Sequence, residues 1–280
     1  MSPRNHRRCA LALVALMLAA PSAPAANIAD LRSDWSNSAN PNANANGAWA
    51  YTESFNPLPS ISSWAGASTV SGWGPAGNVP GNFLPFYFRA TPETIFGADM
   101  FPGDVTVHST DGFNGGGNGP AIVTWTSAVS GTFTIHGMFW PLRMIGRSND
   151  VNLALVHNGN STPLGSLFIP EDGSVTRCNP ARFNLPGITI ASGDVLQLSV
   201  VRVSAPGDFV GLNLAVSTGP CPSAPGDLNN NGAPDGLDIA AFTNCLLNGM
   251  TNCGLCSCGD MDGNNVVNAA DVPLFVAALL

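Results

Sequence analysis

The sequence contains no lysine: every basic residue is an arginine, and charged residues of both signs make up only 10% of the chain. Amphipathic helices usually carry lysine and glutamate on the side that faces water, so this scarcity argues against a mainly helical protein. Glycine (31) and proline (23) are abundant instead, and both favour turns between strands. The hydrophobic content of 45% is high enough for a buried core, which argues against wholesale disorder.

The chain also lacks a stretch of about 20 consecutive apolar residues, the length that spans a membrane as a helix. The apolar run over residues 9–20 is shorter; three arginines precede it, and residues 23–25 form a small-residue cleavage site of the A-x-A type. We therefore expect residues 1–25 to be a secretory signal peptide. The mature protein is then expected to be secreted, in the extracellular space or at the cell surface.

Positive charge is scarcer still in the mature chain. Removal of residues 1–25 takes away three of the ten basic residues and leaves seven against 18 acidic ones, a net charge of −11. A surface this acidic repels phosphate backbones and anionic lipid headgroups. Nucleic acid and anionic membrane surfaces are therefore excluded as main partners.

Six cysteines remain once Cys9 leaves with the signal peptide: Cys178, Cys221, Cys245, Cys253, Cys256 and Cys258. An even number in an exported protein predicts disulfides, although many pairings are open. The alternative is a zinc cluster, formed by Cys245, Cys253, Cys256 and Cys258. Because exported proteins pass into an oxidising compartment, we expect disulfides, and their pairing stays open.

Alternating apolar and polar residues between Gly, Asn and Pro turns predict several strands before residue 217. The segments are 83–90, 121–129, 132–139, 151–155, 196–200 and 209–216. In the segment 132–139, Phe133, Ile135 and Phe139 share one face, and His136 lies on the other. The Ser-Gly pair before that segment predicts that it forms a hairpin with 121–129.

No convincing helix lies between these segments, whereas a parallel α/β fold needs crossover helices. We therefore predict a mainly β fold, an antiparallel β-sandwich of the jelly-roll type, over residues 26–216. The small, polar, proline-containing segment 217–225 is predicted to be a linker to a second domain, residues 226–280.

Residues 226–280 contain an internal repeat. A twelve-residue loop begins at Asp227 and another begins 33 residues later at Asp260, and each leads into an apolar-faced helix. Positions 1, 3, 5, 9 and 12 of both loops are Asp or Asn. Calcium prefers about six to eight oxygen ligands, and a loop of this kind supplies them from these positions, with a backbone carbonyl from position 7. The repeat therefore predicts two calcium sites.

The paired loops, which carry aspartate at position 12 in place of the glutamate of an EF-hand, resemble a type I dockerin. The resemblance covers residues 226–280. It implies a small α-helical domain of two F-hand motifs that binds two calcium ions, with a cohesin-like domain or a cell-surface protein as partner. The implied side-chain ligands are Asp227, Asn229, Asn231, Asp235, Asp238, Asp260, Asp262, Asn264, Asn268 and Asp271; Ala233 and Val266 would contribute backbone carbonyls. Asn265 replaces the glycine that is usual at position 6, and the positions before Asp238 and Asp271 lack the hydroxyl residues typical of the family.

The front domain resembles the jelly-roll domains of secreted bacterial proteins that look like carbohydrate-binding modules. The resemblance rests on the runs SGTFTIHGMF, NDVNLALVHNG, ITIASGDVLQLSV and GDFVGLNLAV and covers residues 83–216. It implies that the domain binds polysaccharide, with exposed tryptophans stacked on sugar rings. Trp49 and Trp64 are the predicted ligand-binding residues, and Trp35 and Trp73 are further candidates. The alternative is that these rings fill one end of the sandwich.

Catalysis is the main alternative function, because dockerins often accompany hydrolases. A glycosidase needs two carboxylates roughly 5–10 Å apart. The candidates are Glu53, Glu93, Glu171, Asp104 and Asp172. None lies in a motif that selects it, H-E-x-x-H and G-x-S-x-G are absent, and Asp172 followed by glycine is typical of a turn. We predict a non-catalytic binding protein; a secreted glycoside hydrolase and a structural surface or matrix protein are the alternatives left open.

Overall fold

The computed structural model describes residues 27–91, 99–100, 102–112, 119–177, 180–203, 206–218, 225–228, 233–248, 256–262 and 267–280. The expected signal peptide, residues 1–25, lies outside the described residues. Within the described ranges, no helix is long and apolar enough to cross a membrane.

Short and medium strands account for most of the regular structure. They are β1 (Asn27–Asp30), β2 (Asn42–Asn44), β3 (Gly47–Glu53), β4 (Asn56–Pro57), β5 (Ser60–Ile61), β6 (Gly72–Trp73), β7 (Phe86–Arg89), β8 (Val105–His108), β9 (Ala121–Ser127), β10 (Gly131–Pro141), β11 (Asn149–His157), β12 (Asn160–Ile169), β13 (Ala181–Ile190), β14 (Val195–Arg202) and β15 (Phe209–Ser217). Four helical elements follow in the described C-terminal residues: η2 (Gly236–Asp238), α1 (Ile239–Asn248), η4 (Cys256–Gly259) and α2 (Asp271–Ala278).

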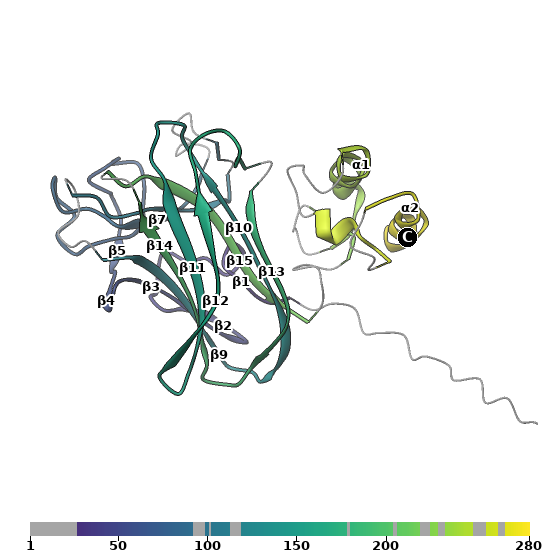
Figure 1. Ribbon diagram of the computed structural model, residues 1–280, viewed down its shortest axis with the longest axis horizontal. Helices are drawn as coiled ribbons and strands as arrows, with labels where there is room; N and C mark the ends of the chain where they lie inside the picture. Colours follow the sequence, from purple (N-terminus) through teal and green to yellow (C-terminus); the bar gives the residue numbers. More distant parts are fainter. Residues whose placement is uncertain are drawn as a thin grey trace, which may run out of the picture.

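The strands form two antiparallel sheets. The first has the order β13-β10-β15-β8-β7-β6-β5, with β1 also paired to β15, and the second has the order β12-β11-β14-β9-β3-β2, with β4 paired to β3. Figure 1 shows β11 and β12 of the second sheet in front, with α1 and α2 to one side, beyond β10 and β13. The prediction of a mainly β, antiparallel sandwich with a small helical module is therefore confirmed.

The predicted hairpin between residues 121–129 and 132–139 is wrong. Strand β9 pairs with β14 and β3 in the second sheet, whereas β10 pairs with β13 and β15 in the first. The connection therefore passes from one sheet to the other across the edge of the core. Ser127 shapes it, because its hydroxyl donates to the carbonyl of Val129 at 2.7 Å and accepts from the backbone amide of the same residue at 3.2 Å. A tight two-residue turn would have kept both strands in one sheet.

The main core lies between the two sheets. Alternation in β3 directs Trp49 and Tyr51 inward, and Trp49 lies in register opposite Trp125 of β9. The predicted apolar face of β10, with Phe133, Ile135 and Phe139, belongs to the same core and is confirmed. His136, expected on the outer face, is nevertheless buried, and its Nε2 lies 3.1 Å from the hydroxyl of Ser217.

The C-terminal module has a separate small core. Its buried members are Leu228, Phe242, Cys245, Cys256, Cys258, Val267 and Phe275. Cys245 in α1 and Cys256 in η4 form a disulfide, and Cys258 is also disulfide-bonded. The expectation of disulfides is confirmed for these three cysteines, and the zinc cluster that used their thiolates is thereby excluded. Cys178, Cys221 and Cys253 lie outside the described residues.

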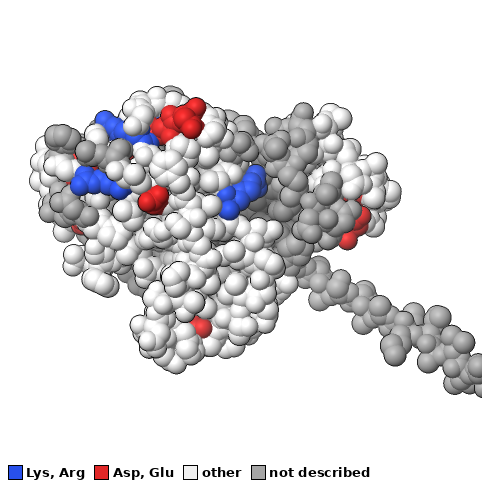
Figure 2. Space-filling model, in the orientation of Figure 1, with Lys and Arg blue, Asp and Glu red and all other residues white. Residues whose placement is uncertain are grey.

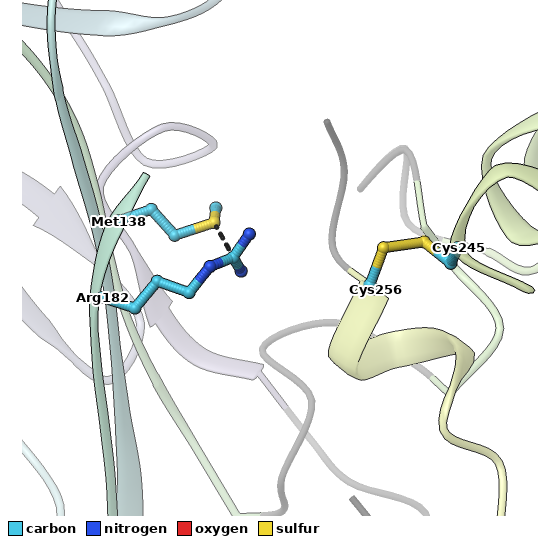
Figure 3. Close-up of a disulfide and its surroundings, with 4 residues drawn as sticks. All are labelled: Met138, Arg182, Cys245 and Cys256. Carbon is cyan, nitrogen blue, oxygen red and sulfur yellow. Dashed lines mark hydrogen bonds between the residues drawn. A yellow bond between two sulfur atoms is a disulfide. The ribbon is translucent and has the colours of Figure 1, made fainter. Parts of the chain in front are cut away.

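The module packs against the sandwich at the outer face of β10. Met138 of β10 contacts the apolar core of the module. Arg182 of the neighbouring strand β13 donates to the sulfur of Met138 at 3.6 Å, and Figure 3 shows both side chains pointing toward the module that carries the disulfide. Burial lowers the pKa of the Arg182 guanidinium. The C-terminal module therefore covers part of the outer face of the first sheet. The face with β11 and β12 carries few charged side chains and is mostly white in Figure 2.

Candidate functional site

The first aspartate-rich loop is organised around its last residue, Asp238, which is completely buried. One carboxylate oxygen of Asp238 accepts from the backbone amide of Leu228 at 2.8 Å, and the other accepts from that of Asp235 at 2.8 Å. The Asp235 carboxylate in turn caps the short helix η2 by accepting from Leu237 at 2.7 Å. These bonds place the ninth and twelfth residues of the loop beside Asp227, its first residue, which is also buried.

The second loop repeats this arrangement around Asp271. Its Oδ1 accepts from the backbone amides of Met261 and Asp262 at 2.7 and 3.1 Å, and its Oδ2 accepts from Asn268 at 2.8 Å. Each partner shared by the two loops is shifted by 33 residues, so Leu228 corresponds to Met261 and Asp235 to Asn268. The same backbone bonds at the same repeat positions show that the two loops have the same local fold.

Three carboxylates of the second loop converge. One oxygen from each of Asp260, Asp262 and Asp271 lies within 4.8 Å of the others, the only such group of His, Cys, Asp or Glu among the described residues. Calcium binds oxygen at about 2.3–2.6 Å, so two ligands on opposite sides of one ion are about 5 Å apart. No Lys, Arg or His occurs in residues 226–280 to neutralise the carboxylates. The donor set therefore fits a hard divalent cation such as calcium.

The remaining predicted ligands divide into two groups. Ala233 and Asn268 lie within the described residues, and the side chain of Asn268 accepts from the backbone amide of Ala270 at 2.8 Å. Asn229, Asn231, Asn264 and Val266 lie outside the described residues. The structure thus brings together the first and last residues of the second loop, together with its third, as the spacing predicted.

Trp49 and Trp64 are not exposed, so the expectation that they stack on sugars is wrong. Trp49 is 0% exposed, and its indole nitrogen donates to the carboxylate of Asp34 at 2.9 Å. Trp64 is 4% exposed, stacks on Phe86 with 4.6 Å between ring centroids, and donates to the carbonyl of Phe83 at 2.9 Å. A ring covered on its faces offers no platform for a sugar, so the alternative, that these rings fill the sandwich, holds.

The other two tryptophans of this region also pack against or hydrogen-bond to the rest of the domain. Trp73 is buried and donates to the carbonyl of Ser36 at 3.0 Å. Trp35 is partly buried and packs at an angle against Tyr51, with ring centroids 5.1 Å apart. Composition could not separate a buried tryptophan from an exposed one here, because these loops fold back as short strands onto the core.

Most of the carboxylates considered for catalysis have structural partners. Asp104 forms an ion pair with Arg177 at 2.7 Å. Asp172 accepts from the backbone amide of Ser174 at 2.9 Å, which confirms the predicted turn. Glu93 lies outside the described residues.

Glu171 lies against another carboxylate. Its Oε2 accepts from the backbone amides of Ile145 and Arg147 at 2.9 and 2.6 Å, while its side chain contacts that of Asp208. Burial and the adjacent Asp208 raise the pKa of Glu171. Asp208 is paired through its other oxygen with Arg143, which donates at 2.9 Å. Glu171 is thus held by two backbone amides and lies beside a carboxylate that is itself paired with Arg143, which is the setting of a structural side chain.

The histidines do not form a metal site with one another among the described residues. His108 is buried with its Nδ1 2.7 Å from the carbonyl of Ser109, and burial lowers its pKa. His157 pairs with Asp194 at 2.6 Å at the turn between β11 and β12. These contacts are those of structural side chains.

Two of the cavities lined by described residues lie on the sandwich. One, of about 560 Å³, lies on the outer face of β11, β12 and β14, where Asn152, Ser166, Gln197 and Ser199 line it. The other, of about 600 Å³, lies beside the end of β3 and is lined by Glu53. In the sequence, Glu53 is one of several carboxylates, and nothing in its neighbourhood along the chain indicates the cavity.

No family model matches the chain, and no curated protein matches it. Among solved structures, the N-terminal cellulose-binding domain of Cellulomonas fimi β-1,4-glucanase C is similar at 10% identity and a TM-score of 0.31, over 61% of this chain and 88% of that chain. TmCBM61 in complex with β-1,4-galactotriose is similar at 11% identity and a TM-score of 0.28, over 47% of this chain and 79% of that one. The family 32 carbohydrate-binding module of C. perfringens NanJ, in complex with galactose, has 12% identity and a TM-score of 0.27, over 39% and 75%. At these TM-scores the similarities assign no ligand, and the sandwich rests on its own strand order.

Proposed function

We propose that this chain is a secreted, non-catalytic binding protein, in which the β-sandwich binds a polysaccharide or cell-surface partner. Its C-terminal module binds two calcium ions and serves as a dockerin-like attachment module for a cohesin-like domain or a cell-surface protein. The observation that carries the proposal is the repeated arrangement of Asp238 and Asp271. The carboxylate of each accepts hydrogen bonds from backbone amides at the same two positions of its own loop.

Calcium follows from the chemistry of the loops. Asp227, Asp238 and Asp271 are completely buried, and residues 226–280 contain no basic side chain. Burying carboxylates without a counter-charge is unfavourable, because each loses its hydration and repels its neighbours. A cation in each loop removes this cost, so metal binding is coupled to the folding of the module.

A binding role for the sandwich follows from what its surface offers. The outer face of β11, β12 and β14 presents the amides of Asn152 and Gln197 with the hydroxyls of Ser166 and Ser199. Amides and hydroxyls both donate and accept hydrogen bonds, as sugar hydroxyls require. The carboxylates with structural partners, by contrast, are committed to ion pairs or backbone amides.

The calcium part is tested by titration of the metal-free mature chain with calcium in a calorimeter. We expect two ions per chain, one ion in either Asp238→Ala or Asp271→Ala, and none in the double variant. Leu237→Ala, at a 73% exposed position beside Asp238, is the matched control and should keep both ions. Two ions bound by the double variant would contradict the assignment.

The binding part is tested with the same chain on a glycan array and in a polysaccharide turnover assay. Retention on a polysaccharide without release of reducing ends supports a binding protein. Release of reducing ends that is lost in Glu53→Gln or Glu171→Gln, with the fold intact, would instead make the chain a glycoside hydrolase. Capture by a cohesin-like domain or by whole cells only in the presence of calcium supports the attachment role.

A further inference from the structure

The cavity beside the end of β3 contains a carboxylate, Glu53, and among the described residues no other titratable side chain lines it. Its polar lining consists of Glu53, Ser54, Asn56 and Asn82, and its apolar lining includes Pro57 and Pro75. Its volume of about 600 Å³ falls in the range of about 300–1,000 Å³ that is usual for small-molecule sites.

Glu53 has an unused acceptor. The backbone amide of Gly119 donates toward its carboxylate, but the second oxygen, Oε1, is buried and has no hydrogen-bond partner among the described residues. A buried acceptor without a donor is unfavourable, and buried polar atoms in folded proteins are nearly always satisfied. Glu53 therefore brings an incompletely hydrogen-bonded carboxylate to the lining of the cavity.

The backbone around Glu53 is held in a constrained shape that forms the rim of the cavity. Ser54 has a φ of 51°, in the left-handed region that non-glycine residues rarely adopt. Two bonds hold it there: its amide donates to the carbonyl of Pro120 at 3.0 Å, and its carbonyl accepts from the hydroxyl of Thr52 at 2.9 Å. Such conformations persist where the surrounding structure enforces them, and they concentrate at binding sites.

The same contact makes a glycine necessary opposite the rim. A Cβ added to Gly119 would come within 1.9 Å of the Ser54 hydroxyl. The close approach brings the Gly119 amide to Glu53 and leaves the cavity beside it open. Glu53, Ser54 and Gly119 therefore form one unit, built from two segments that are distant in the sequence.

The lining selects the class of ligand. Carboxylate, hydroxyl and amide groups are suited to a molecule rich in hydroxyls, and the proline rings offer apolar patches to its CH groups. The cavity has no cation in its lining to hold an anionic ligand, and Glu53 repels one. A single carboxylate also gives too few charged oxygens for a calcium site.

We propose that this cavity is a saccharide site that takes a neutral oligosaccharide, whose hydroxyl groups donate to the carboxylate of Glu53. The inference rests on the proposed polysaccharide-binding function and names the site and the ligand class. Charge-assisted hydrogen bonds are among the strongest in proteins, so Glu53 would supply much of the affinity, and the amides of Asn56 and Asn82 would orient the ligand.

The ionisation of Glu53 gives the site a pH dependence. Burial raises the pKa of Glu53. A protonated carboxyl is a poorer acceptor, so affinity should fall as the pH is lowered through this raised pKa. The lining contributes no second titratable group. Glu53→Gln should bind more weakly and with no such pH dependence.

The test uses the full mature chain with calcium present. Neutral and uronate-containing oligosaccharides are screened on an array, and the best neutral binder is titrated calorimetrically against variants of matched melting temperature. Glu53→Gln and Glu53→Ala should weaken binding roughly 10- to 100-fold, the range for hydrogen bonds to charged groups. Asn152→Ala with Gln197→Ala tests the outer-face cavity in parallel. Val203→Ala, at a 52% exposed position outside both cavities, is the control and should leave the affinity unchanged.

Three outcomes are distinct. Loss of affinity and of its pH dependence in the Glu53 variants alone supports the site. Binding that survives both Glu53 substitutions but is lost in the Asn152 and Gln197 variant overturns this inference and leaves the proposed function standing. Failure of the unmodified chain to bind any glycan overturns the polysaccharide part of the proposed function, and this inference with it.

Discussion

Phe242 and Phe275 lie face to face in the C-terminal module, with ring centroids 4.0 Å apart and ring planes only 1° from parallel. They are 33 residues apart, the same offset as between the two aspartate loops. The two halves of the module therefore meet through equivalent residues, each on the helix that follows its own loop. Through this contact, the folding free energy of each half of the module depends on whether the other half is folded.

Loss of one of these rings should affect both calcium sites. Phe275→Ala removes a 3% exposed aromatic side chain from a small core, which costs about 3–5 kcal/mol for a phenylalanine. We expect weaker binding of both calcium ions, measured by calorimetry on the full chain, and a lower melting temperature of the module. Leu274→Ala, at the neighbouring position that is 43% exposed, is the control and should change little. Loss of only the second ion in Phe275→Ala would contradict the coupling.

The disulfide between Cys245 and Cys256 should support the module independently of the metal. It closes a loop with a sequence separation of 11 and ties α1 to η4. Its removal by Cys245→Ser with Cys256→Ser should cost about 2–4 kcal/mol, because the unfolded chain gains freedom. Thermal unfolding with and without calcium measures the effect.

Reductant provides the control for this experiment. Dithiothreitol should lower the melting temperature of the unmodified chain more than that of the double variant, which has already lost this bond. Equal melting temperatures of the two proteins under oxidising conditions would show that the disulfide contributes nothing to stability.

The two sheets of the sandwich should not tolerate charge on their inner faces. Ile135 of β10 and Leu198 of β14 are each completely buried in the same core. Substitution of either by aspartate buries a carboxylate without a partner and should abolish soluble expression. Gln197→Asp is the matched control, because Gln197 neighbours Leu198 in the chain but lines the outer-face cavity. Soluble, folded protein from both core variants would mean that the assigned face is wrong.

Glu171 should make stability depend on pH in a defined direction. Burial and Asp208 raise its pKa above the ordinary value of 4.5, so the folded state binds the proton more tightly than the unfolded state. This contribution is fully present below the unfolded pKa and is lost as the pH rises through the higher folded pKa. Stability from this group should therefore fall as the pH increases from about 4.5 upward.

Glu171→Gln tests this sign. Glutamine keeps an oxygen to accept from Ile145 and Arg147, and it carries no negative charge beside Asp208. The variant should lose this part of the pH dependence and be at least as stable as the unmodified chain near pH 8. Glu171→Ala, which removes the acceptor as well, should be less stable at every pH. Parallel curves of unfolding free energy against pH for the unmodified chain and Glu171→Gln, measured by chemical denaturation between pH 4 and 8, would count against a raised pKa of Glu171.

The sequence by itself determined the features that depend on near neighbours in the chain. Alternation within a strand marked the inward face of β10, with Ile135, and that of β14, with Leu198, because side chains of a strand point to opposite faces in turn. The aspartate loops are equally local: Asp260, Asp262 and Asp271 lie within one twelve-residue segment, and one carboxylate oxygen of each converges in the structure.

Only the tertiary structure decided which segments face one another across the molecule. A Ser-Gly pair predicted a turn but not that β9 and β10 would enter different sheets. Trp49 and Trp64 were predicted to bind sugars, yet both are buried by contacts with Asp34, Phe83 and Phe86, which no local pattern connects to them. Glu53 and Gly119 form the rim of one cavity although 66 residues separate them. Such contacts arise because folding buries the largest apolar surface it can, and that optimum is a property of the whole chain.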